Sequence, residues 1–461
     1  MEKNDVVTLT ATGFGSNGEG VAKADGYTVF VPFLLKGERA RVRILKVKDT
    51  IAYGKIEEIF TPAEERVRPV CGVFMRCGGC NLQHVRYREQ LIMKTALVKD
   101  ALRKIGGIDF PVSFCERSEK ELGYRNKLQL PIGRKDGKNV IGFYAERSHR
   151  IVEIKECPIH PKWSGKVISA LAGYMQESGV NGYDEETGEG ELRHILVREL
   201  KGGVLVVLVS AGRRLKNAEL LFRRLDKIFP EYSFYLNFND KKTNVVLGEE
   251  FVLLKGAGKY ACTECGITYE AGANTFIQVN SDVRAKLYAC AVSLVDGDET
   301  VVDCFSGGGL LTAMFAKKCK RAYGIEIVKE ASQMANALAK ANGLEEKMFN
   351  LCGRVEDELA GILEREKEAT VVLDPPRAGV ERSVLKEILA RNIKKVIMIS
   401  CNPATLARDL GILTGSLIET EKGELVKTEE GKGIYEIKLV KPFDMFPQTR
   451  HVETLVMLQR K

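Results

Sequence analysis

Three cysteines that lie close together in the sequence predict a metal centre. Cys71, Cys77 and Cys80 form a C-x5-C-x2-C pattern in a glycine-rich segment, whose flexible backbone lets the thiols converge on one soft metal. Cys157, which is followed by Pro158, is the fourth ligand that we expect. Three clustered cysteines and a distant one are more usual for a four-iron cluster than for a zinc site. We therefore predict a [4Fe–4S] cluster, with zinc or a chance grouping as the alternatives.

Another cysteine has the setting of a nucleophile. Cys401 comes directly after the predicted strand 396–400, so its thiol is held in a loop and not in the core. Glu453 precedes the predicted strand 455–458 and is a candidate general base, although an isolated glutamate is more often a solvated side chain. Cys262 and Cys265 have no partner pair and are interpreted as structural thiols. The remaining cysteines are expected to be small buried hydrophobes: Cys115, Cys290, Cys304, Cys319 and Cys352.

A glycine-rich turn between a predicted strand and a predicted helix indicates a cofactor site. In the segment 301–309, glycines allow the backbone to approach a ligand, with amide groups at the helix start facing it. Glu326 ends the next predicted strand, where an acid can bind ribose hydroxyls. The spacing is not G-x-G-x-x-G, which favours S-adenosylmethionine over a dinucleotide. Asp374, in Asp374-Pro375-Pro376-Arg377, follows a further strand and should lie at the same sheet edge.

The elements that position these residues divide the chain into three expected units. Residues 1–62 contain five short strands with glycine-containing turns, typical of an OB-like β-barrel. Residues 63–272 contain the cysteine motif, an amphipathic helix over 88–105 and several strands, which predicts a mainly β-rich domain. Residues 273–461 alternate apolar strands with helices, which predicts an α/β fold with a doubly wound parallel sheet. The expected strands are 300–304, 322–325, 370–373 and 396–400, and the expected helices are 310–318 and 329–342.

Composition and charge restrict the class of protein. The 461 residues are 44% hydrophobic and 29% charged, the balance of a globular protein with ample core. The longest apolar run, 204–209, is far shorter than the roughly 18 residues of a membrane span, and the start of the chain lacks a signal-peptide pattern. We expect a cytoplasmic protein without a membrane partner. Seventy Lys and Arg against 62 Asp and Glu give a net charge of +8. Seven of these basic residues lie in 36–55, indicating either a nucleic-acid surface or a solvated strand face.

Taken together, these motifs resemble those of the RNA uracil-C5 methyltransferases. Within that family, the chain is most similar to the iron–sulfur-containing branch that acts on 23S ribosomal RNA and carries an N-terminal TRAM domain. The resemblance covers residues 1–461 and is carried by the following segments: the four cysteines 71, 77, 80 and 157, the Phe276-Ile277-Gln278-Val279-Asn280 segment, the Asp303 loop, Asp374-Pro375-Pro376-Arg377, Ser400-Cys401-Asn402-Pro403-Ala404-Thr405 and His451-Val452-Glu453-Thr454.

The resemblance implies a role for each residue in these segments. Cys401 matches the nucleophile that adds to C6 of uracil, and Glu453 matches the base that removes the C5 proton. Gln278 matches the residue between cofactor and target base. The remaining matches are cofactor residues and substrate contacts: Asp303, Phe305, Gly307, Glu326 and Asp374 for the cofactor, and Arg125, Phe276, Gln278 and Asp374 for the substrate. The implied partner is 23S rRNA with a loop or flipped uridine, bound by a monomer.

Three alternatives stay open. The transfer-RNA methyltransferase of the same family is the nearest one. A radical S-adenosylmethionine enzyme is disfavoured because it usually carries C-x3-C-x2-C on a barrel. A non-catalytic RNA-binding module would explain the basic strands but would leave Cys401, Glu453 and Gln278 without a purpose. The sequence identifies neither the modified uridine nor the role of the cluster, for which we expect a structural or RNA-positioning function.

Overall fold

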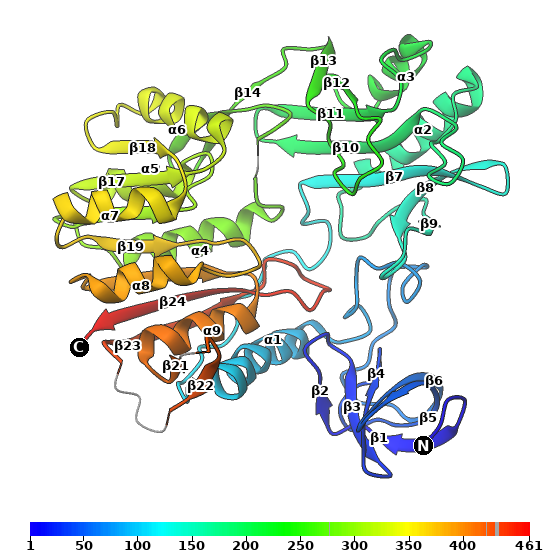
Figure 1. Ribbon diagram of the computed structural model, residues 1–461. Helices are drawn as coiled ribbons and strands as arrows, with labels where there is room; N and C mark the ends of the chain where they lie inside the picture. Colours follow the sequence, from blue (N-terminus) through cyan, green and yellow to red (C-terminus); the bar gives the residue numbers. More distant parts are fainter. Residues whose placement is uncertain (276, 421, 429–432) are drawn as a thin grey trace.

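The computed structural model describes residues 1–461 with the exception of 276, 421 and 429–432 (Figure 1). Its parts form two large lobes and a small barrel, with the barrel below the central lobe in Figure 1. In the described part of the chain, no helix is long and apolar enough to cross a membrane.

The N-terminal barrel follows from alternating side chains. In its longest apolar-in, polar-out stretch, Ala40, Val42 and Ile44 are fully buried, while the arginines between them are exposed. The sheet has the order β1-β5-β6-β4-β3-β2, which adds one short strand to the five that the sequence predicts. Its strands are β1 (Val6–Thr10), β2 (Gly13–Phe14), β3 (Gly20–Ala24), β4 (Tyr27–Val31), β5 (Arg39–Lys48) and β6 (Ile51–Thr61).

The central lobe is a seven-stranded sheet of order β13-β12-β11-β10-β7-β8-β9, covered by two helices. Its pairs are antiparallel except for β11 and β12, which run parallel and are nearly continuous in apolar residues. The elements are β7 (Lys127–Lys135), β8 (Lys138–Tyr144), β9 (Ile151–Glu153), α2 (Trp163–Ser178), β10 (Leu192–Leu200), β11 (Gly203–Ser210), α3 (Ala218–Leu225), β12 (Tyr232–Phe238) and β13 (Glu250–Lys255).

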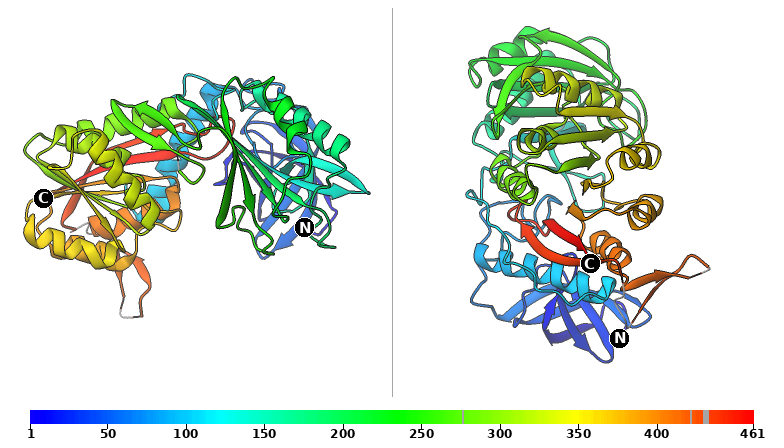
Figure 2. Two further views of the ribbon diagram at one scale, coloured as in Figure 1. Left: turned by 90° about the horizontal axis from the view of Figure 1, so that it is seen from above. Right: turned by 90° about the vertical axis from the view of Figure 1, so that its left-hand side faces the viewer.

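The C-terminal lobe is the predicted α/β unit. Its sheet has the order β18-β17-β16-β19-β20-β24-β23, in which the first five strands are parallel and the last two antiparallel. Its strands are β16 (Thr300–Cys304), β17 (Arg321–Glu326), β18 (Met348–Cys352), β19 (Thr370–Leu373), β20 (Lys395–Ser400), β23 (Tyr435–Phe443) and β24 (Glu453–Arg460). Its helices are α4 (Ser281–Ser293), α5 (Leu310–Lys318), α6 (Lys329–Ala341), α7 (Val355–Arg365), α8 (Arg382–Ala390) and α9 (Pro403–Thr414). A small hairpin, β21 (Leu417–Glu419) and β22 (Leu425–Lys427), projects from this lobe (Figure 2).

Two segments from the middle of the chain pack on the C-terminal lobe. Helix α1 (Tyr87–Ala101), which continues into a π-helical turn over Leu102–Gly106, buries Leu91 and Val98 in the same core as strands β19 and β20. The hairpin β14 (Tyr260–Glu264) and β15 (Ile267–Ala271) packs on α5 and α6 on the other face. The sequence assigns both segments to the expected 63–272 unit, although they pack on the C-terminal lobe. Local periodicity marks a buried face of a helix or strand but does not show which part of the protein covers it. The boundaries at 62 and 272 stay predictions.

Candidate active site

Cys401 and Glu453 meet at one end of the C-terminal sheet. Strands β20 and β24 are antiparallel neighbours in which Ser400 pairs with Thr454. Cys401 therefore comes just after the end of β20, opposite Glu453 at the start of β24. Asn402 holds the Cys401 turn, because its side chain accepts a hydrogen bond from the Ala404 N–H and donates one to the Arg377 carbonyl at 3.0 Å. Pro403 then begins α9, as proline suits the first turn of a helix.

Cys401 and Glu453 lie in a buried setting that is rich in acidic side chains. Burial raises the pKa of the Cys401 thiol, the nearby Glu453 carboxylate adds to the rise, and the Arg377 guanidinium opposes it. Burial also raises the pKa of Glu453, which is 4% exposed, to about 8, with Asp374 adding to the rise. A carboxyl group with this pKa is a stronger base than an exposed one and titrates in the range where enzymes work. The thiol rests in its neutral form near pH 7.

Two further acids lie at the same sheet edge. Asp374 follows β19 and Asp303 lies near the end of β16, and desolvation raises the pKa of each to about 7. The Thr312 hydroxyl of α5 donates to Asp303 at 2.6 Å, so this buried carboxyl ties the strand to the helix that follows it. Neighbouring Asp374 and Glu326 raise the pKa of Asp303 further through charge repulsion.

The glycine-rich turn has the geometry of a nucleoside-cofactor site. Glu326, at the end of β17, accepts hydrogen bonds from the Gly307 N–H at 2.9 Å and the Val328 N–H at 2.8 Å. Gly307 (φ +55°) and Phe305 (φ +67°) both adopt the left-handed conformation. Gly309 (φ +82°) also has no room for a side chain, because a Cβ there would come within 2.7 Å of Ala335. The turn therefore brings its backbone amides and the Glu326 carboxylate to one edge of the sheet.

Two residues near the pair have no role predicted from the sequence. Arg377 ends the Asp374 motif, and its effect on the pKa values of both Cys401 and Glu453 shows that its charge lies close to each. Tyr288 projects from α4, and burial raises its pKa, with Asp374, Asp303 and Glu453 contributing. Arg377 could have been found from its position two residues after Asp374-Pro375. Tyr288 lies in a helix without any motif, so the sequence offered no signal for it.

The predicted substrate residues are distributed over two places. Phe276 lies outside the described residues. The carbonyl of Gln278 accepts a hydrogen bond from Asn126 at 3.0 Å, which ties this segment to the start of β7. Arg125 lines the cavity of the cysteine motif, where its Nε is buried without a hydrogen-bond partner among the described residues. Its charge also contributes to lowering the pKa of His451, after burial and the charges of Arg450, Arg377 and Lys94.

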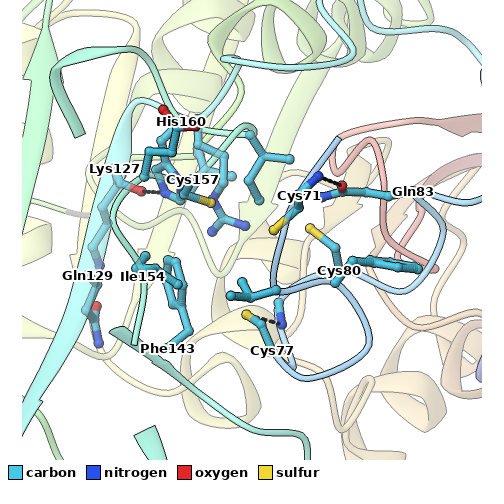
Figure 3. A pocket seen from close by; sticks show the side chains of 17 residues that line it. Cys71, Cys77, Cys80, Gln83, Lys127, Gln129, Phe143, Ile154, Cys157 and His160 are labelled. Carbon is cyan, nitrogen blue, oxygen red and sulfur yellow. Dashed lines mark hydrogen bonds between the residues drawn. The ribbon is translucent and has the colours of Figure 1, made fainter. Parts of the chain in front are cut away.

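The four predicted cluster ligands line one cavity. Cys71, Cys77 and Cys80 approach it from one loop and Cys157 from the opposite wall (Figure 3). Its volume is about 180 Å³, and Phe143, Ile154 and His160 complete the wall of Cys157. Desolvation raises the pKa of Cys80 to about 11 and of Cys157 to about 12, and the thiols raise one another further. As they stand, no three Cys, His, Asp or Glu side chains within the described residues are arranged to hold a metal ion.

The other cysteines divide between core and surface. Cys262 is buried in β14, whereas Cys265 is exposed in the hairpin turn, so these two thiols do not share a face. Cys115, Cys304 and Cys319 are buried, as expected. The expectation is wrong for Cys352, which is exposed at the end of the outermost strand β18, and Cys290 is only half-buried on α4. An apolar neighbourhood in sequence does not reveal which strand lies at the sheet edge.

The basic residues of the barrel are only partly available to a partner. Arg41 and Arg43 form ion pairs with Glu57 and Glu58 of the neighbouring strand, the shortest at 2.6 Å. In the described part of the chain, no ion pair involves Lys46, Lys48 or Lys55. The excess of basic residues in 36–55 therefore overstates the free positive charge, because the paired acids lie just beyond that stretch.

A larger hollow lies where the barrel meets both lobes. It has a volume of about 430 Å³ and is lined by residues of the barrel, the turn after β8 and the segment before β24. On its barrel side, the rings of Phe30 and Tyr53 stack at 5.8 Å, and Tyr53 is 42% exposed. Arg147 and Arg450 lie on its other side. Exposed aromatic rings beside arginines are a setting in which unpaired nucleotides stack.

Known proteins share this chain's sequence and its structure. Residues 225–461 match the family model of tRNA (uracil-5-)-methyltransferases, and residues 2–56 match that of the TRAM domain. An RNA methyltransferase of Clostridium tetani is 39% identical, with 99% of this chain and 97% of the relative covered. One of Halalkalibacterium halodurans is 38% identical over 100% of this chain and 98% of its own.

A solved structure extends the likeness to the whole fold. The Pyrococcus abyssi tRNA (uracil-54, C5)-methyltransferase, solved with S-adenosyl-L-homocysteine, superposes with a TM-score of 0.74 and 26% identity, covering 98% of this chain and 99% of that one. The predicted family, TRAM domain and methyltransferase fold are thereby confirmed. This chain belongs to the tRNA (uracil-5-)-methyltransferase family, as an RNA methyltransferase that uses S-adenosylmethionine and carries an N-terminal TRAM domain.

Proposed function

We propose that the protein methylates C5 of a uridine in 23S rRNA through a covalent adduct between Cys401 and C6 of the base. The observation that carries this proposal is the pairing of β20 with β24, which puts a thiol opposite a buried carboxyl at the edge where the cofactor turn ends. Uracil C5 is too weak a nucleophile to take a methyl group directly. A thiolate that adds at C6 overcomes this by turning the ring into an enolate.

Each step of the reaction can be assigned to a residue of this site. The Cys401 thiol gives its proton to water, and its sulfur forms a bond to C6 while the electrons of the C5–C6 double bond move into the enolate. C5 would then take the methyl group that bound S-adenosylmethionine supplies, with S-adenosylhomocysteine as the by-product. Glu453 takes the proton from C5, the double bond forms again, and the sulfur–C6 bond breaks to release the Cys401 thiolate.

The cofactor would lie against the turn after β16. Glu326, whose carboxylate accepts a hydrogen bond from the Gly307 N–H, would bind the ribose hydroxyls. The Asp303 carboxyl holds the turn through Thr312. Asp374, between this turn and Cys401, would orient either the uracil or the cofactor. Gln278, Phe276 and Arg125 remain expected contacts of cofactor or substrate.

The predicted [4Fe–4S] cluster would be held by Cys71, Cys77, Cys80 and Cys157. Their common cavity and the preference of iron for thiolates support it. A cluster there would link the loop 71–80 to the segment around Cys157 and needs no part in methyl transfer. Anaerobically purified protein should contain about four iron and four acid-labile sulfide atoms per chain. One zinc ion per chain, or neither metal, would contradict the cluster.

The target RNA is decided by a transfer experiment. Labelled methyl from S-adenosylmethionine is followed into unmodified ribosomal and transfer RNA that are separated before counting. We expect 5-methyluridine in large-subunit RNA. Transfer RNA is the second candidate, because the superposed Pyrococcus abyssi enzyme is a tRNA (uracil-54, C5)-methyltransferase. Label in transfer RNA alone would keep the chemistry and overturn the proposed target, and no label in either RNA would overturn the function.

The barrel should contribute to RNA affinity through its unpaired lysines. Replacing Lys46 and Lys48 by alanine is expected to weaken RNA binding and to reduce the slope of log affinity against log salt by about one for each phosphate that the barrel no longer neutralises. The matched control replaces Arg41 and Arg43, whose charges are already partnered by Glu57 and Glu58, and should change the slope less. Titrations of labelled RNA at several salt concentrations measure both. An unchanged slope in the lysine variant would contradict a role of these strands in RNA binding.

A further inference from the structure

Asn81, the residue after Cys80, forms hydrogen bonds with the loop 444–452 that leads to Glu453. Residues 444–452 connect β23 to β24, which begins at Glu453. The backbone N–H groups of Asn81 and Leu82 both donate to the Gln448 carbonyl, at 3.2 and 3.0 Å. The Arg450 N–H donates to the Asn81 side-chain oxygen at 2.8 Å. Asn81, next to Cys80, thus holds the loop at two points, the second of them three residues before Glu453.

Helix α1 reinforces this contact from below. Gln90 is fully buried and exchanges two hydrogen bonds with Gln448, both 3.0 Å long: one between the side chains and one from the Gln448 N–H. One turn further along, the buried Lys94 pairs with Asp444 and donates to the Phe446 carbonyl at 3.1 Å. A buried lysine and aspartate must stay together, because separating them leaves an uncompensated charge. Helix α1 therefore contacts the 444–452 loop both at its start, through Lys94, and near its end, through Gln90.

The conformation of the loop depends on these partners. Gln448 has a φ of +69°, a left-handed backbone that non-glycine residues adopt only where their surroundings hold them. Its carbonyl, amide and side chain are all engaged by Asn81, Leu82 and Gln90. Loss of the Asn81 side chain would remove the contact nearest to Glu453, the one with the Arg450 N–H, while the backbone bonds to Gln448 remain.

The turn of Cys401 is held by a different set of contacts. The Arg377 carbonyl accepts hydrogen bonds from the Asn402 side chain at 3.0 Å and from the Thr405 hydroxyl at 3.4 Å. None of the hydrogen bonds that the structure gives to Asn81 or Gln448 reaches this turn. A change at Asn81 can therefore displace Glu453 while Cys401 stays in place.

We propose that Asn81 is a positioning residue for Glu453, through which the cysteine loop governs the second half of the reaction, proton removal and release of the adduct. The inference rests on the proposed function of Cys401 and Glu453, and it gives the cysteine loop a task in that reaction. Addition of Cys401 and methyl transfer precede the step that needs Glu453. They should proceed normally when Asn81 is changed.

The experiment is a single turnover of Asn81→Ala at saturating enzyme, using labelled S-adenosylmethionine and the RNA that accepts methyl in the transfer assay. Label is counted in the protein–RNA adduct that survives denaturation and in free RNA. We expect the rate of methyl transfer to change less than about twofold and release of methylated RNA to slow about tenfold, so that labelled adduct accumulates. Asn81→Asp keeps the side-chain oxygen that accepts from Arg450 and should restore release.

The matched control is Asn139→Ala. Asn139 is also half-buried and its side-chain oxygen also accepts one backbone N–H, that of Gly182 at 2.9 Å, but in the central lobe. It should release RNA at the normal rate. Equal slowing of both steps in Asn81→Ala, the same defect in Asn139→Ala, or no rescue by Asn81→Asp would overturn the proposal. Asn81→Ser replaces Asn81→Ala if the latter does not fold. Methyl transfer by Cys401→Ala would instead refute the proposed function.

Discussion

Replacing Cys401 by alanine should abolish both methylation and formation of a covalent protein–RNA complex. Without the thiolate that adds to C6, the rate of methyl transfer should fall by at least about a thousandfold. Binding of S-adenosylhomocysteine and of RNA should be retained, because the cofactor turn and the barrel do not depend on the thiol. Transfer of labelled methyl to RNA, measured beside equilibrium binding of both ligands, checks the prediction.

A control substitution at a second cysteine tests whether the loss of activity is specific to Cys401. Cys265→Ala removes an exposed thiol from the turn between β14 and β15 and should leave methyl transfer unchanged. The pH dependence is a second check. Since burial raises the pKa of the Cys401 thiol, the rate of adduct formation should increase with pH across the neutral range. Normal methylation by Cys401→Ala would refute the proposed covalent mechanism.

The sequence predicts candidate site residues where they lie at the end of an apolar strand or in a glycine-rich or proline-rich turn. The apolar strands 300–304 and 370–373 and the helix 310–318 have in the structure the bounds that the sequence indicates, because an uninterrupted apolar run next to a glycine-rich or proline-rich turn leaves little choice. Parallel strands end at one edge of a sheet. Asp303, Glu326 and Asp374 therefore had to come together.

Long-range pairing was the part that the sequence could not supply. Glu453 looked like an isolated glutamate until the register of β24 against β20 put it opposite Cys401. The contact between Asn81 and Arg450 joins residues that lie 369 positions apart. Hydrophobic periodicity is a local signal, so it shows that α1 has a buried face and not that this face carries Gln90 and Lys94 to the 444–452 loop. A hydrophobic pattern does not identify buried polar side chains such as Gln90 and Lys94.

Replacing Glu453 by glutamine should stop the reaction after methyl transfer. The amide has nearly the same shape but cannot accept the C5 proton, so the methylated uridine stays bonded to Cys401. Turnover should fall by about 10² to 10⁴, the usual contribution of a positioned general base. The amount of label should reach about one methyl per enzyme, in a complex that survives denaturation. Gel electrophoresis of enzyme incubated with labelled S-adenosylmethionine and RNA measures that complex.

The pKa of Glu453 adds a test that a merely structural role would not pass. Burial raises this pKa to about 8, and only the deprotonated carboxylate can take the C5 proton. Release of methylated RNA should therefore rise with pH up to about 8 and then level off, as the carboxyl loses its own proton. In Glu453→Gln, release should lose this dependence. Rapid turnover by Glu453→Gln without a stable adduct would show that another group removes the proton. Asp374, the neighbouring buried carboxyl whose pKa is raised to about 7, would then be the next candidate.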